Sequence, residues 1–180
     1  SEMCIRDRSI YSWMQVDYGG EMETIYFAGG CLWGVEYFMK NLPGVKATEA
    51  GRANGKTDSL DGPYDGYAEC VKVVFDDTAV TVQKLMNFFF EIIDPYSVNR
   101  QGRDKGLKYR TGVYSRKEEL LEKAKAFIEG RPDREKIKVE VLPLTRYVKS
   151  REEHQNHLER FPEDEYLCSI PRDILNKYRK

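Results

Sequence analysis

Residues 29–36, Gly-Gly-Cys-Leu-Trp-Gly-Val-Glu, constrain the fold of this chain more than any other stretch. The apolar run 25–28 leads into them, and an apolar stretch continues to Leu42, where Pro43 and Gly44 end it. This order predicts a strand, a tight turn and a helix, with Cys31 in the first helical turn. Free backbone N–H groups and the helix dipole lower the pKa of a cysteine at that position and favour its thiolate. We therefore interpret Cys31 as a nucleophile.

Cys31 also has a structural interpretation, as a small buried residue that closes the corner between the strand and the helix. Trp33 favours the chemical interpretation, because an indole beside a thiol can form the wall of an apolar pocket that carries one polar group. Both interpretations remain open at this point.

Composition limits the class of protein. A chain of 180 residues with 41% hydrophobic residues can bury one core, so we expect a single domain. The net charge of −1, with both signs interspersed, indicates neither a nucleic-acid nor an acidic partner. No apolar run reaches the roughly 18 residues of a membrane span. Four cysteines, at positions 4, 31, 70 and 168, form no CxxC pair, which argues against a zinc site and fits a reducing, cytoplasmic setting.

Residues 1–22 match neither a helix nor a strand pattern and lack the pattern of a signal peptide. We expect them to form a leader outside the domain, disordered or not native to the protein. Cys4 in this leader is expected to take no part in the chemistry. The catalytic domain is then predicted to cover residues 23–180, with a tail that carries Cys168.

Glu69 lies in an alternating pattern that predicts a strand over residues 67–75. The pattern puts Glu69 on the same face as Val71, Val73 and Phe75, which must point into a core. Apolar surroundings penalise the carboxylate, so the pKa of Glu69 is expected to rise and the group to serve as a general acid. The alternative is a wet or arginine-paired glutamate at the strand end. Cys70 falls on the opposite face and is expected to be packing.

The remaining patterns predict the order of elements. They are a strand over 45–53, a turn-rich loop over 54–66, a helix capped by Thr81 and ending at Asp94, a polar connection over 96–108, a strand over 110–114, a helix from a Ser115/Glu118 capping box to Gly130, and a strand at 137–141. Strands and helices in this order predict an α+β fold, a two-layer sandwich of a mixed sheet with flanking helices.

His154 and His157 could suggest a metal site, since they lie three residues apart. With no cysteine or further histidine nearby they are weak as ligands, and we expect a solvated helix and no metal. Residues 99–106 hold arginines and glycines but lack the spacing of a phosphate-binding loop.

Residues 30–34, Gly-Cys-Leu-Trp-Gly, resemble the Gly-Cys-Phe-Trp-Gly signature of the A-type peptide methionine sulfoxide reductases, with Leu32 in place of phenylalanine. The similarity extends from about residue 25 to residue 171. Gly66-Tyr67-Ala68-Glu69 resembles the family's Gly-His-Ala-Glu, with tyrosine in place of histidine. Residues 99–110 are similar to its Asn-Arg-Gln-Gly-x-Asp-x-Gly-x-x-Tyr-Arg stretch. The resemblance implies the ferredoxin-like sandwich of that family.

The resemblance also implies an activity, the reduction of methionine S-sulfoxide in oxidised proteins or as the free amino acid. Cys31 would attack the sulfur while protonated Glu69 donates to the oxygen. The remaining implied site residues are Asp104, Tyr109 and Tyr64 around the oxygen, with Leu32 and Trp33 around the S-methyl group. On its chemistry alone, Asp104 equally suits the stabilisation of an Asx turn.

Cys168 lies in a predicted loop before Pro171. By resemblance it would condense with a sulfenic acid on Cys31 to a disulfide, which thioredoxin or a similar thiol reductant would reduce. The family needs no metal or organic cofactor.

Two other functions fit the residues. An activated cysteine with an acid partner also suits another thiol enzyme, such as a peroxidase or an acyl-transfer hydrolase. A comparison of the turnover of peroxide with the turnover of a sulfoxide distinguishes a peroxidase from a sulfoxide reductase. The second function is that of a binding or interaction domain in which Cys31 is structural. An unreactive Cys31 thiol of ordinary pKa would support it.

Overall fold

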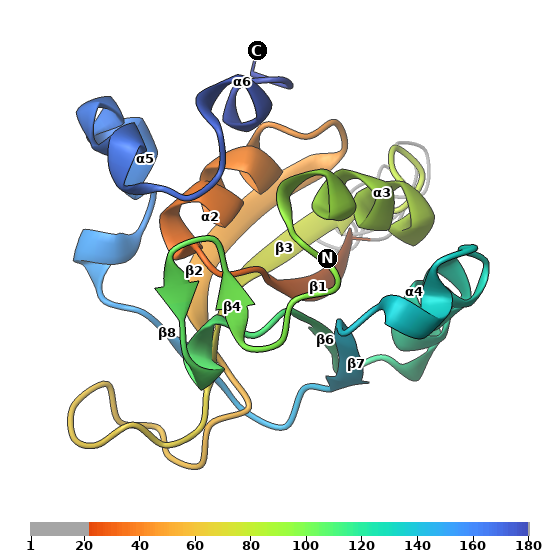
Figure 1. Cartoon of the computed structure of the whole chain (residues 1–180), viewed down its shortest axis with the longest axis horizontal. Helices are drawn as coiled ribbons and strands as arrows, with labels where there is room; N and C mark the ends of the chain where they lie inside the picture. Colours follow the sequence, from red (N-terminus) through yellow and green to blue (C-terminus); the bar gives the residue numbers. More distant parts are fainter. Residues whose placement is uncertain (1–21, 180) are drawn as a thin grey trace, which may run out of the picture.

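The structure is a computed structural model that describes residues 22–179. Cys4 and all of the predicted leader except Met22 therefore lie outside the described residues. Within the described part, six strands form one mixed sheet in the order β7-β6-β1-β3-β2-β8 (Figure 1). They are β1 (Met22–Ala28), β2 (Val45–Ala53), β3 (Ala68–Asp76), β6 (Gly112–Ser115), β7 (Glu140–Pro143) and β8 (Tyr147–Lys149).

Strand β1 lies inside the sheet and pairs antiparallel with β3 and with β6. Strand β2 pairs antiparallel with β3 and with the edge strand β8. Only β6 and β7 run parallel among the described strands, because helix α4 (Glu118–Glu129) connects them as a crossover. The predicted α+β fold with a mixed sheet is therefore confirmed.

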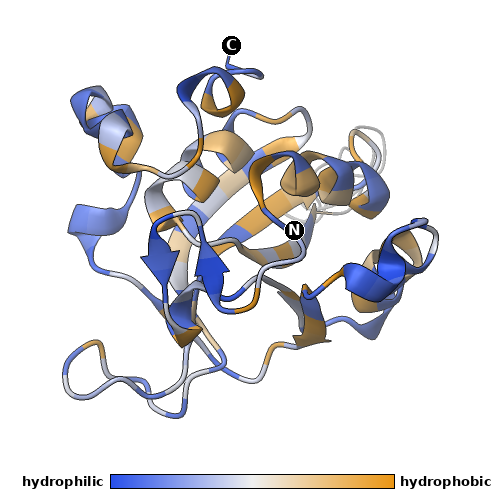
Figure 2. Cartoon of the chain, viewed as in Figure 1, coloured by the Kyte–Doolittle hydropathy of each residue, from blue (hydrophilic) through white to orange (hydrophobic). Residues whose placement is uncertain are grey.

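The helices cover one face of the sheet. α2 (Leu32–Lys40) contacts β2 and β3, and α4 contacts β6 and β7. α3 (Val82–Ile92) contacts α4, and the short α5 (His157–Arg160) and α6 (Arg172–Leu175) contact α2. Apolar residues concentrate on the strands and on the inner sides of these helices (Figure 2). The main core therefore lies between the sheet and the helical layer.

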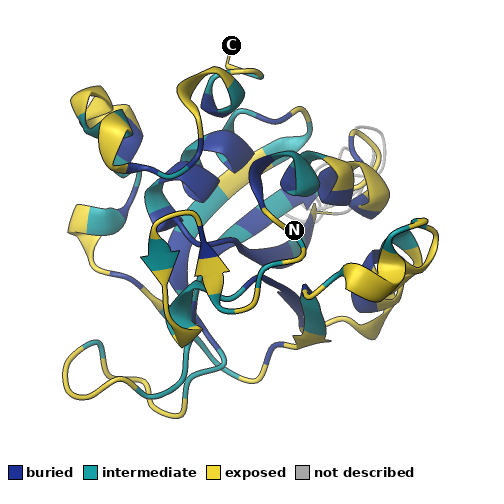
Figure 3. Cartoon of the chain, viewed as in Figure 1, coloured by how far each residue is buried: buried dark blue, intermediate teal, exposed yellow. Residues whose placement is uncertain are grey.

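The alternation of β1 and β3 divides the buried residues into two clusters. Ile25, Phe27, Val71, Val73 and Phe75 belong to the large core under the helices. Tyr26, Ala28, Ala68 and Cys70 belong to a smaller cluster on the other face, where Tyr147 packs against them. Central strands are accordingly buried, while much of the loop over residues 54–66 is exposed (Figure 3).

Helix α3 forms as its pattern predicts. The Thr81 hydroxyl accepts a hydrogen bond from the Lys84 N–H at 3.1 Å, which satisfies one of the free donors at the helix start. Its predicted inner face is buried: Val82, Leu85, Phe89 and Ile92.

Two expectations about the second half are wrong in detail, and one strand was not predicted. Ser115 is the last residue of β6 and accepts from the Lys117 N–H, so α4 begins at Glu118 without a capping box. The strand expected from Ile137 begins at Glu140, because its partner β6 begins only at Gly112. The edge strand β8 was not predicted, because its three residues are too few to show an alternation of apolar and polar side chains.

The polar connection has structure of its own. β4 (Arg100–Gln101) and β5 (Asp104–Lys105) form a small hairpin, and a short 3₁₀ helix, Leu107–Tyr109, follows it. This 3₁₀ helix contacts β3. No helix within residues 22–179 combines the length and the apolar character of a membrane span.

Candidate active site

Cys31 is the N-cap residue of α2, with an extended backbone at φ −69° and ψ 101°. Gly30 before it has φ +86°, a conformation that favours glycine, and a Cβ there would overlap the Gln101 side chain. The turn between β1 and α2 therefore requires glycine at this position. It leaves the Cys31 sulfur at the positive end of the helix, as the sequence predicts.

The Sγ atom of Cys31 lies 2.8 Å from the Sγ atom of Cys168, and both cysteines are free. The two side chains are buried, with 9% and 7% of their surfaces exposed. A hydrogen bond from the Cys168 thiol is the main factor that lowers the pKa of Cys31, and burial acts against it. The same hydrogen bond and burial raise the pKa of Cys168. When this pair loses a proton, the negative charge therefore lies on Cys31 rather than on Cys168.

Gly34 provides the space for this contact. It lies one turn after Cys31 in α2, and a Cβ at Gly34 would overlap the Cys168 sulfur and come within 2.9 Å of Ile170 Cδ1. Its backbone N–H also helps to lower the pKa of Cys31. Glycine is unfavourable inside a helix, so its presence here follows from the close approach of the tail.

A cavity of about 210 Å³ opens beside Cys31. Six of the residues predicted for the site line it together with two that were not predicted: Cys31, Leu32, Trp33, Glu69, Asp104 and Tyr109, then His154 and Leu167. These residues come from the start of α2, β3, the hairpin, the 3₁₀ helix Leu107–Tyr109, a second 3₁₀ helix (Glu152–His154) and the tail. Segments distant in the sequence therefore meet around one sulfur.

Glu69 is the second residue of β3 and reaches this cavity from the sheet. Burial raises the pKa of its carboxyl to about 7, and the charge of Asp104 raises it further, while Lys108 and Arg52 act in the opposite direction. A substantial fraction of Glu69 is therefore protonated near neutral pH. Its carboxyl can donate a proton to an atom in the cavity.

Asp104 and Tyr109 lie on either side of the turn between the hairpin and the 3₁₀ helix. Burial raises the pKa of Asp104, and its carboxylate makes no hydrogen bond to the described residues, so the Asx-turn alternative has no support. The Tyr109 ring packs under the Lys108 ammonium, 5.1 Å from the ring centroid. Both side chains remain available to a ligand in the cavity.

Tyr64 does not lie with these residues. It is 46% exposed, and its hydroxyl donates to the Tyr67 carbonyl oxygen at 2.5 Å. It lines a neighbouring cavity between the 54–66 loop and the 3₁₀ helix rather than the cavity at Cys31. The loop carries Tyr64 away from the sulfur, so the structure does not support its expected place around the sulfoxide oxygen.

The two histidines are partly buried against Trp33, whereas the sequence predicted a solvated helix. The Trp33 indole N–H donates to His154 Nδ1 at 3.3 Å, and the His157 ring stacks on Trp33 with centroids 3.6 Å apart. His157 Nε2 is in turn 2.7 Å from Asp164 Oδ2. The three-residue spacing puts both histidine rings on one side of the chain. The residue that they contact, Trp33, precedes them by more than a hundred positions in the sequence.

Cys70 is packing, as the alternation of β3 predicts. It belongs to the cluster on the face of the sheet opposite to Cys31, and burial raises the pKa of its thiol. Of the three described cysteines, two therefore belong to the site and the third is separated from it by the sheet.

Comparison with known proteins agrees with this arrangement. Residues 23–180 match the family model described as peptide methionine sulfoxide reductase. The peptide methionine sulfoxide reductase MsrA of Clostridium acetobutylicum is 37% identical over 170 residues, which cover 87% of this chain and 100% of the relative.

Solved structures show the same fold. Reduced Mxr1 from Saccharomyces cerevisiae is similar with a TM-score of 0.73 and 28% identity, over 79% of this chain and 87% of Mxr1. Methionine sulfoxide reductase A of Corynebacterium diphtheriae is similar with a TM-score of 0.69 and 32% identity, over 78% of this chain and 76% of that protein. From the cavity at Cys31, the match over residues 23–180 and these relatives, we conclude that the chain belongs to the A-type peptide methionine sulfoxide reductase family.

Proposed function

We propose that this protein reduces the S epimer of methionine sulfoxide, free and in proteins, with Cys31 as nucleophile, Glu69 as acid and Cys168 as resolving thiol. The observation that carries the proposal is the cavity that Cys31 and Glu69 share, with the Cys168 sulfur 2.8 Å from that of Cys31. A nucleophile, an acid and a second thiol are the groups that this reaction needs.

In the first step the Cys31 thiolate attacks the sulfur of the sulfoxide. The Glu69 carboxyl gives its proton to the sulfoxide oxygen, which becomes basic as the S–O bond polarises. The attack forms an S–S bond between Cys31 and the substrate. The protonated oxygen then moves from the substrate sulfur to the Cys31 sulfur as the S–O and S–S bonds break, so methionine leaves as the thioether and Cys31 becomes a sulfenic acid. Tyr109 and Asp104 line the cavity where the oxygen would lie, and Leu32 and Trp33 would enclose the S-methyl group.

In the second step the Cys168 sulfur attacks the sulfenic acid sulfur of Cys31. Water leaves, and a Cys31–Cys168 disulfide forms. A dithiol reductant then supplies two electrons and two protons and restores both thiols. We propose a thioredoxin-type reductant, since yeast Mxr1, a protein with this fold, has been solved in complex with Trx2. A cytoplasmic location, where such reductants keep thiols reduced, is part of the same proposal.

The test is a thioredoxin-coupled assay with the two separated sulfoxide epimers and, as a third substrate, hydrogen peroxide. We expect turnover of the S epimer and neither of the other two at a comparable rate. Preferred turnover of peroxide would support the peroxidase alternative instead.

Two serine variants assign the sulfurs. Cys31→Ser is expected to lose all reduction of the sulfoxide. Cys168→Ser is expected to release one methionine per enzyme and then stop with thioredoxin as donor. Full activity of Cys31→Ser would contradict the assignment of the nucleophile, and undiminished thioredoxin-driven turnover of Cys168→Ser would contradict that of the resolving thiol.

A further inference from the structure

A second cavity, of about 380 Å³, lies next to the active site and is larger than the cavity at Cys31. Its wall consists of residues 59–65 of the long loop, Arg52 from β2, Tyr67 directly before β3, and residues 105–108. The reaction proposed above uses none of these residues. This cavity, here called the flanking cavity, therefore needs its own explanation.

One segment, residues 104–109, separates the flanking cavity from the active site. Asp104 and Tyr109 at its two ends line the cavity at Cys31, whereas the residues between them, from Lys105 to Lys108, line the flanking cavity. Arg52 of the flanking cavity is also the cross-strand neighbour of Glu69. A peptide with its sulfoxide beside Cys31 would thus have its neighbouring residues at this partition.

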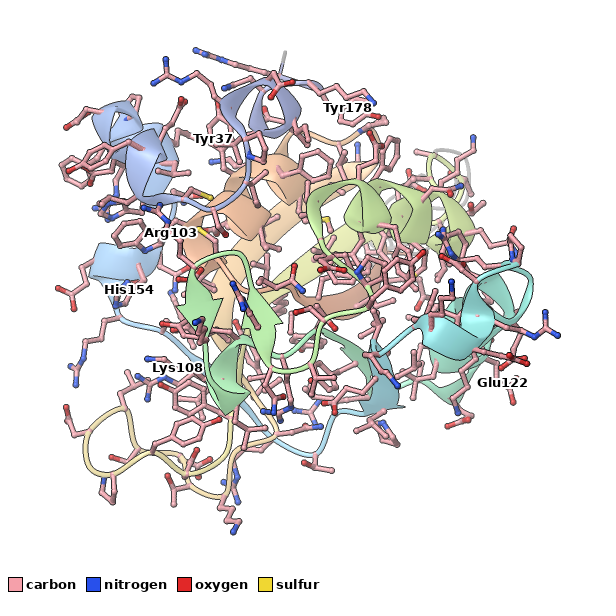
Figure 4. All side chains as sticks on the ribbon, in the orientation of Figure 1. Tyr37, Arg103, Lys108, Glu122, His154 and Tyr178 are labelled. Atoms are coloured by element: carbon pink, nitrogen blue, oxygen red, sulfur yellow. The ribbon has the colours of Figure 1, made fainter. Side chains whose placement is uncertain are left out.

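The flanking cavity carries excess positive charge. Its cations are Arg52, Lys105 and Lys108, and none of them is ion-paired with a carboxylate of the described residues. Figure 4 shows Lys108 beside the hairpin, on the side of the 54–66 loop. The Arg52 guanidinium instead lies over the Tyr67 ring, 4.4 Å from its centroid, and donates to the Leu60 carbonyl oxygen.

The two acidic residues of the flanking cavity, Asp61 and Asp65, form no ion pair with its three cations. Asp61 pairs with the Arg151 guanidinium. Asp65 Oδ2 accepts from the Thr57 N–H at 2.9 Å and from the Thr57 hydroxyl at 2.7 Å. Neither carboxylate forms an ion pair with Lys105, Lys108 or Arg52. Asp61 is offset by Arg151, so these three cations face a single remaining carboxylate, Asp65, and the cavity is suited to a carboxylate from outside.

We propose that the flanking cavity binds an acidic side chain that lies close in sequence to the oxidised methionine of a protein substrate. This inference rests on the proposed function and adds to it a preference among protein substrates. The Tyr64 and Tyr67 rings, 4.8 Å apart, give the methylene groups of a glutamate an apolar surface, while the ammonium and guanidinium groups attract its carboxylate. Free methionine sulfoxide has no such side chain and does not use this cavity.

Lys105 is the residue to change. It is exposed, its backbone pairs with Arg100 in the hairpin, and its side chain lines the flanking cavity without reaching the cavity at Cys31. Lys105→Gln removes the charge and Lys105→Glu reverses it. Lys125→Gln on the exposed side of α4 makes the same charge change away from the site and is the matched control.

The experiment measures kcat/KM for heptapeptides with a central methionine S-sulfoxide and either Glu or Gln at one, two or three positions to each side. We expect the wild-type protein to prefer Glu over Gln by about threefold at one or more positions, because exposed ion pairs contribute modestly. The preference should fall toward one in Lys105→Gln, reverse in Lys105→Glu, decline with added salt, and persist in Lys125→Gln.

Free methionine sulfoxide distinguishes the two possible failures. Equal kcat/KM for Glu and Gln peptides at low salt, or a preference that survives Lys105→Glu, would overturn the subsite while the free compound is still reduced. Failure of the wild-type protein to reduce the free compound would instead contradict the proposed function itself. We expect its kcat/KM to be the same in the wild-type protein and in Lys105→Gln.

Discussion

The indole ring of Trp33 lies flat against the imidazole ring of His157, with centroids 3.6 Å apart and an angle of 10° between the planes. Asp164 and the Glu153 carbonyl oxygen each lie within hydrogen-bond distance of a ring nitrogen of His157, so the imidazole is fixed and orients the indole in turn. The wall of the cavity at Cys31 thus depends on a histidine that does not line it.

We therefore expect His157→Ala to raise the KM for methionine sulfoxide by about two- to tenfold, the range that corresponds to the loss of one stacked aromatic pair. The kcat is expected to stay within about twofold, because the reacting groups are unchanged. Steady-state kinetics with the free sulfoxide measure both. His157→Phe keeps the stack and is the control. An unchanged KM in His157→Ala would show that Trp33 keeps its orientation without this ring.

In the proposed mechanism, the pKa of about 7 at Glu69 sets the pH dependence of the chemical step. The acid must be protonated, so the single-turnover rate is expected to fall as the pH rises through about 7. Glu69→Gln cannot donate a proton, and we expect a rate lower by about a hundredfold that no longer falls across this range. Rapid-quench measurement of methionine formed per enzyme gives these rates. A pH profile shared by both proteins would assign the titration to another group.

The same pKa shift affects stability. An unfolded glutamate ionises near pH 4.5, whereas folded Glu69 keeps its proton up to about pH 7. Its contribution to the free energy of unfolding is therefore fully present below pH 4.5 and is lost as the pH rises from 4.5 to about 7. We expect Glu69→Gln, which has no charge to bury, to gain stability relative to the wild-type protein across this interval. Urea denaturation of both proteins at pH 4, 6 and 8 measures this gain. If the free energies of unfolding of Glu69→Gln and the wild-type protein differed by the same amount at all three pH values, the pKa shift of Glu69 would be contradicted.

Gly34 gives the Cys168 sulfur its place beside Cys31. In Gly34→Ala the methyl group would displace Cys168, so we expect disulfide formation to slow by about tenfold or more, since small misplacements of reacting groups have large effects on rate. The first methionine should still be released. Quantifying free thiols after one turnover separates the two steps. If Gly34 acts through Cys168, the double variant Gly34→Ala/Cys168→Ser should recycle no worse than Cys168→Ser alone. A further loss in the double variant would mean that Gly34 acts through Cys31 alone.

Local patterns in the sequence were sufficient to predict where Cys31, Glu69 and Cys70 lie within their helix and strand. The alternation of residues 67–75 separates Glu69 from Cys70, and the structure puts these two residues on opposite faces of β3. The strand, turn and helix around Cys31 follow equally from a local run of residues, and Cys31 lies at the N-cap of α2. Side chains repeat every 2 residues along a strand and every 3.6 along a helix, and each face of such an element meets either the core or solvent. The spacing of apolar residues therefore shows which face a residue lies on.

Contacts between distant segments could not be predicted in the same way. The 54–66 loop has no period, so nothing in it indicates that Tyr64 points away from Cys31. His154 and His157 look solvated in their own segment, and only the packing of the tail against α2 brings them to Trp33. The role of Gly34 likewise depends on Cys168, which lies far along the chain.

The two sulfurs of the site are separated by 137 positions in the chain. A bond between them would close a loop that includes every strand of the main sheet except β1, and cross-links around long loops restrict the unfolded chain most. The loop-entropy relation gives an upper limit of about 5 kcal/mol for this effect. The oxidised enzyme, which awaits its reductant, is then the form that best resists heat and denaturants, and every reduction returns the protein to a less robust fold.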